Sequence, residues 1–273
     1  MQAGSRGSLA EARERLDAIT GALDTGALEA LTEQLFAFAH LIQGELRVRR
    51  ALTDTSAEAA QKIALLDRLV GSQLGADARG IVDLLVAARW STARDLVEAA
   101  DTLAALTLLA VAERGNVLDE VEDELFRFAR VLDGQPTLRA ALIDPTLPTD
   151  RKISVLDALI GGGKAQLATV RLVSEAVLFA RGRTLDEALE TYAALAAVRR
   201  DRLSAHVRTA VALTEAQESR LAATLERQYG RAVELHIEID PAVVGGLNIQ
   251  IGDEVVDATI TRRLGDARQR FAS

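Results

Sequence analysis

Cysteine is absent from this chain of 273 residues, which excludes disulfide bonds and every site that needs a thiolate as nucleophile or metal ligand. Aromatic residues are also scarce, at 3% of the sequence, although hydrophobic residues reach 49%. A core of this composition must consist of Leu, Val, Ile and Ala side chains. Such a core suits close-packed helices better than a pocket that stacks a flat ligand.

The sequence also lacks a surplus of positive charge and a long apolar run. The formal net charge is −8, whereas proteins that bind nucleic acid normally carry a basic surface. The longest apolar run, residues 103–112, ends at Glu113, well short of the roughly 20 residues that cross a bilayer. The first residues contain no apolar block of the secretory type. We therefore expect no nucleic-acid partner, no direct membrane span and a cytoplasmic protein.

An internal repeat dominates the first 200 residues. A shift of 90 residues aligns identical residues in three separate blocks, and beyond Gly71 and Gly161 the correspondence shifts by two. The aligned identities are Leu35, Phe36, Phe38 and Ala39 with Leu125, Phe126, Phe128 and Ala129; Arg49, Leu52 and Asp54 with Arg139, Leu142 and Asp144; and Lys62, Ile63, Leu66 and Asp67 with Lys152, Ile153, Leu156 and Asp157. Helical periodicity alone does not fix identity and register together, so we interpret residues 1–102 and 103–202 as two tandem helical bundles.

The C-terminal part, residues 203–273, has a different pattern. Apolar and polar residues alternate from Ala205 to Leu213 and again over 233–239 and 247–251, which is typical of half-buried strands. Thr214 and Gln217 form a capping-box pattern before a helix that ends near Gly230. A fourth strand at 254–257 and a last helix follow. The expected fold class is therefore mainly α, with two tandem helical bundles followed by a small α+β C-terminal domain.

Patterns that would carry chemistry are weak in this chain. The glycines at 161–163 followed by Lys164 lack the first Gly and the Ser or Thr of a phosphate loop, so we expect an inter-helix loop. His40, His206 and His236 have no i, i+4 partner and fall on predicted solvent faces. The acidic run at 119–124 reads as the wet face and charged first turn of a helix. We expect no catalytic, cofactor-binding or metal site. Trp90 is left open between an exposed anchor and a packing residue.

The order of residues near the C-terminus is too specific to be explained by secondary structure alone. Val233 and Leu235 precede a set of apolar residues, glycines and charged residues in fixed order. This set is Ile239, Asp240, Val243, Gly245, Gly246, Leu247, Ile249, Gly252, Asp253, Asp257, Arg262, Arg263 and Leu264. It resembles the C-terminal signature of the delta subunit of F-type ATP synthase, the bacterial counterpart of the mitochondrial oligomycin-sensitivity-conferring protein. Residues 103–202 resemble the family more loosely, through 109–115 and 144–146.

The resemblance implies a peripheral-stalk, or stator, subunit with no catalytic activity. Such a subunit links the catalytic head to the membrane-anchored b stalk and resists rotor torque during proton-driven ATP synthesis. The implied partners are the N-terminal segments of the alpha subunits, received by residues 103–202, and the C-terminus of the b-type stalk subunit, held by 203–273. The implied place is peripheral, on the cytoplasmic face of the bacterial plasma membrane. This chain departs from the family by carrying two helical bundles where one is usual.

Two other classes of function compete with this interpretation. A helical-repeat scaffold or adaptor unrelated to ATP synthase explains the duplication but not the ordered glycines from 245 to 252. An enzyme would have to rest on the loop at 161–164 alone. Binding partners separate the first alternative from a stator subunit, and a loss of nucleotide binding in Lys164→Ala would support the second.

Overall fold

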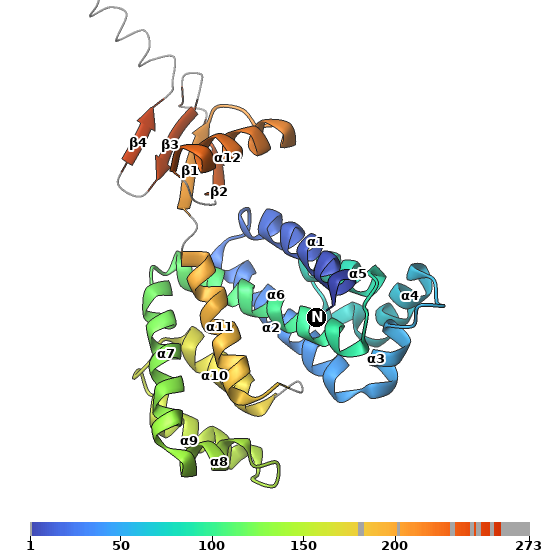
Figure 1. Ribbon diagram of the computed structural model, residues 1–273. Helices are drawn as coiled ribbons and strands as arrows, with labels where there is room; N and C mark the ends of the chain where they lie inside the picture. The colour runs from blue at the N-terminus through green and yellow to red at the C-terminus, as the bar shows by residue number, and fades with distance from the viewer. Residues whose placement is uncertain are drawn as a thin grey trace, which may run out of the picture. The chain divides into compact units, whose positions relative to one another are not determined.

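A computed structural model describes residues 2–179, 183–200, 203–229, 233–240, 243, 247–251 and 254–257. The chain divides into two compact units, residues 1–197 and 198–273, and each is described by itself (Figure 1). The first unit is helical and the second combines a sheet with a helix. The fold is thus mainly helical with a small sheet near the C-terminus, as expected. No helix in the described ranges is long and apolar enough to traverse a lipid bilayer.

The helical unit contains eleven described α-helices and one short 3-10 helix. They are α1 (Ala3–Thr20), α2 (Thr25–Gly44), α3 (Leu46–Leu52), α4 (Ala59–Val70), η1 (Gly71–Gln73), α5 (Ala76–Ala87), α6 (Ala93–Arg114), α7 (Leu118–Gly134), α8 (Pro136–Ile143), α9 (Thr149–Ile160), α10 (Leu167–Leu178) and α11 (Leu185–Arg200). The helix bounds follow the sequence repeat. Both ends of α9 lie 90 residues after those of α4, and both ends of α10 lie 91 residues after those of α5.

Side-chain contacts recur with the same spacing. The carboxylate of Asp54 accepts hydrogen bonds from the backbone N–H and hydroxyl of Ser56, and that of Asp144 accepts the same pair from Thr146. The side-chain oxygen of Gln34 accepts from the N–H of Gly75, just ahead of α5. Glu124, 90 residues later, does the same for Gln166 ahead of α10. Capping from a neighbouring helix satisfies N–H groups that a helix start leaves without a partner.

Helix α6 occupies the centre of this unit. It begins 90 residues after α1 and 92 residues before α11. Helix α6 is therefore both the last helix of the first copy, as α11 is of the second, and the first helix of the second copy, as α1 is of the first. Its Ala- and Leu-rich sequence is buried on most sides, from Leu96 to Ala112. The expected boundary between residues 102 and 103 falls inside this continuous helix. One cluster of buried side chains contains residues of both copies, so the copies share a core.

The described part of the second unit holds a four-stranded sheet and one helix, and the last helix expected from the sequence lies outside the described residues. Its elements are β1 (Leu203–Thr209), α12 (Glu215–Tyr229), β2 (Val233–Ile239), β3 (Leu247–Ile251) and β4 (Glu254–Asp257), and the strand order is β2-β1-β3-β4. Strand β1 is parallel to β2 and antiparallel to β3, and β3 is antiparallel to β4. The core consists of Ala205, Val207, Leu225, Val233 and Ile249. The parallel β1–β2 pair needs a crossover, which α12 supplies.

The first strand is shorter than the sequence pattern predicted. The alternation continues to Leu213, but β1 ends at Thr209 and Val211 is 69% exposed. The reason is that its partners stop there: Thr209 pairs with Ile239, the last residue of β2, and with Leu247, the first of β3. The predicted cap is present, because the N–H of Thr214 donates to Gln217 Oε1 at 2.8 Å and Thr214 Oγ1 accepts from the N–H of Gln217 at 3.4 Å.

Candidate interaction surfaces

The family-signature residues lie on β2, β3, β4 and the turn after β2, as far as the structure describes them. Ile239 ends β2, and the N–H of Asp240 donates to Thr209 O at 2.9 Å. The N–H of Val243 donates to Asp240 O at 3.1 Å. In β3, Leu247 pairs with Thr209 and Ile249 is buried, and Asp257 of β4 pairs with Asn248. The remaining signature residues, Gly245, Gly246, Gly252, Asp253, Arg262, Arg263 and Leu264, lie outside the described residues.

One end of this sheet exposes apolar side chains. Ile239 is 56% exposed and Val211 is 69% exposed. They belong to the same end of the sheet, because Ile239 pairs with Thr209 and the hydroxyl of Thr209 donates to Val211 O at 3.0 Å. Exposed apolar groups that cluster in this way are a feature of protein-binding surfaces.

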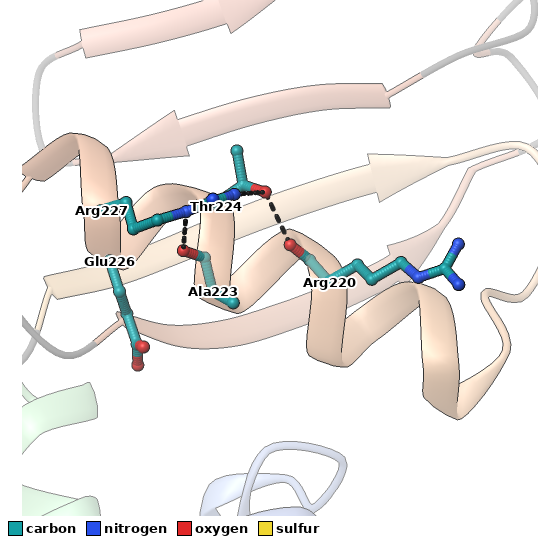
Figure 2. Close-up of a pocket in the computed structure, with 5 residues that line it drawn as sticks. All are labelled: Arg220, Ala223, Thr224, Glu226 and Arg227. Carbon is teal, nitrogen blue, oxygen red and sulfur yellow. Dashed lines mark hydrogen bonds between the residues drawn. The ribbon is translucent and has the colours of Figure 1, made fainter.

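Helix α12 presents a charged surface with no reactive arrangement. Figure 2 shows a pocket lined by Arg220, Ala223, Thr224, Glu226 and Arg227. The hydroxyl of Thr224 donates to Arg220 O at 2.8 Å, and Nε of Arg227 donates to Ala223 O at 3.2 Å. These groups bind the carbonyls of their own helix. Nothing in this geometry pairs a nucleophile with a base.

A mostly apolar groove of about 630 Å³ lies in the helical unit, between the N-terminal ends of α2 and α10 and the C-terminal end of α6. Its apolar lining includes Leu108, Val111 and Ala112 of α6 and Ala168 of α10. Four charged residues also line it, namely Glu29, Glu33, Arg114 and Arg171. At its rim Leu167, the first residue of α10, is 87% exposed. An apolar groove edged by charge suits an amphipathic helix.

A seam of polar and aromatic contacts joins α2 to α10. Nε2 of His40 lies 2.7 Å from Glu175 Oε2, and the His40 ring stacks on Phe179 with 3.6 Å between centroids. Arg171 bridges the helices by bonding Glu33 at 3.1 Å while its guanidinium carbon lies 5.0 Å from the Phe36 ring centroid. The prediction that His40 lies on a solvent face is therefore wrong, because tertiary packing covers that face. His206 and His236 lie in β1 and β2, and their side chains are outside the description.

A buried charge network joins α6 to α11 and the residues just before it. Asp101 is fully buried and accepts hydrogen bonds from the Tyr192 hydroxyl at 2.8 Å and from Arg183 at 2.5 Å. Burial opposes the charge on Arg183, but the Asp101 carboxylate and Tyr192 outweigh it and raise the pKa of the guanidinium. A paired buried charge is stabilised by its partner and is costly to break. This network fixes α11 against α6.

Structural roles are taken by Trp90, which the sequence left open, and by the glycine-rich stretch at 161–164. Trp90 is 5% exposed and its Nε1–H donates to Leu85 O at 2.7 Å, so it is a packing residue. The glycine-rich stretch follows α9, with Gly162 and Gly163 at φ of 64° and 81°, and Lys164 donates to Ala158 O. It is an inter-helix loop, as predicted. Across the described part of the chain, no group of three or more His, Asp or Glu side chains is placed to hold a metal ion.

Known proteins match this chain over most of its length. The family model described as "ATP synthase delta (OSCP) subunit" matches residues 103–271. The ATP synthase subunit delta of Streptomyces avermitilis is 46% identical over 269 residues, covering 98% of both chains. That of Acidothermus cellulolyticus is 43% identical over 275 residues, covering 100% of both. That of Streptomyces coelicolor is 43% identical over 273 residues, covering 100% of this chain and 99% of the relative.

These relatives align with the first helical copy as well as with the region that the family model covers, so the duplication is not a peculiarity of this sequence. The signature residues and the full-length relatives agree with each other. The chain belongs to the ATP synthase delta (OSCP) subunit family and is a non-catalytic, peripheral-stalk component of an F-type ATP synthase.

Proposed function

We propose that this chain connects the catalytic head of the ATP synthase to the membrane-anchored b-type stalk and holds the head still against rotor torque. The observation that carries the proposal is family membership over residues 103–271. The helical unit has the properties that a static strut needs, since its core of buried aliphatic side chains runs through both copies. Close-packed cores resist deformation and transmit force. The chain resides at the cytoplasmic face of the plasma membrane through its partners.

The N-terminal helical segments of the alpha subunits dock on the second helical copy, residues 103–202. The site that best fits such a segment is the apolar groove where α6 and α10 of this copy meet α2, a helix of the first copy. Its apolar lining accepts the apolar stripe of an amphipathic helix, and the exposed carboxylate of Glu29 can pair with a basic residue on the charged face of that helix. Exposed Leu167 supplies an apolar anchor at the rim.

The C-terminal end of the b-type stalk subunit docks on residues 203–273. The exposed pair Val211 and Ile239, at one end of the sheet, supports this assignment because both are apolar and Ile239 belongs to the family signature. Two separate attachments on one chain also slow release, because each bound partner keeps the other at high effective concentration.

The groove is tested with full-length chain and a synthetic alpha N-terminal peptide. Leu167→Asp places a charge at the groove rim and is expected to weaken peptide binding by about tenfold or more. Ile153→Asp is the matched control, because Ile153 is 49% exposed on α9 and does not line the groove. Equal binding by both variants would remove this groove from the proposal while leaving the stalk role intact.

The stalk role itself is tested in membranes from a strain that lacks the chain. We expect the head to detach and proton-driven ATP synthesis to be lost, and restored by the wild-type gene. Fully coupled ATP synthesis by an intact enzyme without this chain would contradict the proposal. Purification of the chain without any ATP synthase subunit would instead favour an unrelated scaffold.

A further inference from the structure

The repeat makes α2 and α7 equivalent helices, and one stripe of each carries the same kinds of residue. Glu33, Phe36 and His40 on α2 correspond to Asp123, Phe126 and Arg130 on α7, at a constant offset of 90. Both helices bury the neighbouring core stripe, since Leu35 and Phe38, like Leu125 and Phe128, are buried. The two helices differ, however, in how far the phenylalanine is exposed. Phe36 is 0% exposed, whereas Phe126 is 59% exposed.

The cover over Phe36 is helix α10. Arg171 pairs with Glu33 and lies over the Phe36 ring, and one turn later Glu175 contacts His40. Phe179 then stacks on the His40 ring. The cover therefore consists of an arginine and a glutamate four residues apart on α10 and of Phe179, the C-cap residue that directly follows the helix. Helical geometry places Arg171 and Glu175 on one face, and the stacking of Phe179 on His40 places its ring on the same side.

The stripe on α7 keeps the chemistry for a similar cover. Asp123 and Arg130 are both exposed and lie on either side of Phe126 in the sequence, so the acidic, aromatic and basic order of α2 is preserved. Arg130 replaces a histidine with a permanent positive charge, and its guanidinium carbon lies 5.9 Å from the Phe126 ring centroid. Helix α7 runs along one edge of the helical unit in Figure 1. A lone exposed phenylalanine needs no explanation, but one whose repeat equivalent lies in a helix–helix seam does.

We propose that Asp123, Phe126 and Arg130 of α7 form a docking stripe for one amphipathic helix of a partner protein. That helix carries a basic residue opposite Asp123 and Phe126 and a carboxylate one turn further on, opposite Arg130. A second copy of this chain is not the occupant, because its own α10 residues with this pattern are engaged by its α2. The stripe is separate from the groove between α2, α6 and α10 and rests on the repeat alone, not on the role assigned to the groove.

The probe is a soluble helical peptide of Ala, Lys and Glu that carries Arg, Glu and Phe at positions i, i+4 and i+8. Binding to the full-length chain is followed by fluorescence anisotropy, together with a second peptide in which Glu replaces the Arg. We expect the Arg peptide to bind about tenfold more tightly, because the Glu peptide faces Asp123 with like charge. Phe126→Ser should abolish binding of the Arg peptide. Its fold is checked by circular dichroism and should be unchanged because the side chain is exposed.

Charge reversal on the protein provides the decisive comparison. The Asp123→Arg variant should no longer bind the Arg peptide and should bind the Glu peptide instead. The control Glu14→Arg makes the same change of charge at an exposed position of α1 and should leave the preference as in wild type. Equal affinity for both peptides, binding that survives Phe126→Ser, or a switch of preference in Glu14→Arg would overturn the proposal. None of these outcomes depends on the alpha-peptide experiment, so the two proposals fail separately.

Discussion

Single side chains hold α11 in place through the carboxylate of Asp101. This group is fully buried and accepts a hydrogen bond from the Tyr192 hydroxyl. Arg183 also donates to it and balances its charge. These two donors lie 91 and 82 positions away in the chain, so the network is a tertiary feature. Sequence reasoning missed it because a lone Asp within an Ala-rich helix carries no visible partner.

Tyr192→Phe removes one hydrogen bond from this network without creating a cavity. We expect the free energy of unfolding to fall by about 1–3 kcal/mol, because Asp101 keeps its burial and loses a donor. Urea denaturation followed by circular dichroism measures the change. Thr191→Val is the neighbouring control, since its hydroxyl donates to Glu187 O at an exposed site and its loss should change stability by no more than about 0.5 kcal/mol. Equal losses in the two variants would argue against a special role for the Asp101 network.

Two repeat-equivalent carboxylates make stability depend on pH. Hydrogen bonds from Ser56 hold the pKa of Asp54 below its usual 3.8, and those from Thr146 do the same for Asp144. A lowered folded-state pKa means that each carboxylate stabilises the fold above pH 3.8 and loses that contribution as pH falls through the folded value. Asp54→Asn with Asp144→Asn keeps the acceptor oxygens but cannot titrate. We expect the melting temperature of this variant to fall less steeply below pH 4 than that of wild type. Parallel acid profiles would contradict the assignment.

Helices α2 and α7 share a sequence pattern but differ in their surroundings. Phe36 and Phe126 occupy the same step of the repeat, yet only Phe36 is buried, because α10 covers the Phe36 side of α2, whereas the Phe126 side of α7 is exposed. Phe36→Ala should lower the free energy of unfolding by about 3–5 kcal/mol. The matched Phe126→Ala should change it by no more than about 0.5 kcal/mol. Guanidinium denaturation of the two variants measures the contrast, and similar losses would mean that α7 is covered in solution.

The periodicity of the sequence predicted the helices and strands better than it predicted which elements pack against one another. The acidic run at 119–124 does lie largely on the wet face of α7, and the cap at Thr214 forms as the spacing indicated. The extent of β1 could not be read from alternation, because its end is set by where β2 and β3 stop pairing. The burial of Phe36 and the partial burial of His40 could not be read from the sequence either, because the residues that cover them are 135 or more positions away. An amphipathic pattern identifies a core face but not which polar face meets a partner.

At the scale of the whole molecule, the functional conclusion rests on the family signature, and the fold shows which residues are exposed. The ordered residues after Val233 specified the family, which the match over 103–271 confirms. The residues proposed to bind partners leave a weaker trace in the sequence, since Leu167 and Phe126 look like any other apolar position of a helix. Their exposure is visible only after the helices are packed.

The central helix decides whether the two copies can act as separate bodies. A linker between independent bundles would tolerate an insertion near residue 102, but α6 is continuous from Ala93 to Arg114 and supplies buried side chains on both sides of that point. A five-residue Gly/Ser insertion after Thr102 should therefore lower the free energy of unfolding by about 3 kcal/mol or more, since each glycine within a helix costs about 1 kcal/mol relative to alanine and the shared core loses register.

The same insertion after Gly115 is the control, because Gly115 and Asn116 form an exposed connection between α6 and α7. There the chain should keep nearly wild-type stability, since a longer surface loop adds little entropy cost. Urea unfolding of both full-length variants, followed at 222 nm by circular dichroism, separates the two outcomes. Equal tolerance at both sites would mean that the halves fold as independent bundles, and torque could then be absorbed by bending between them. Failure only at residue 102 would show that α6 makes the helical unit one stiff body.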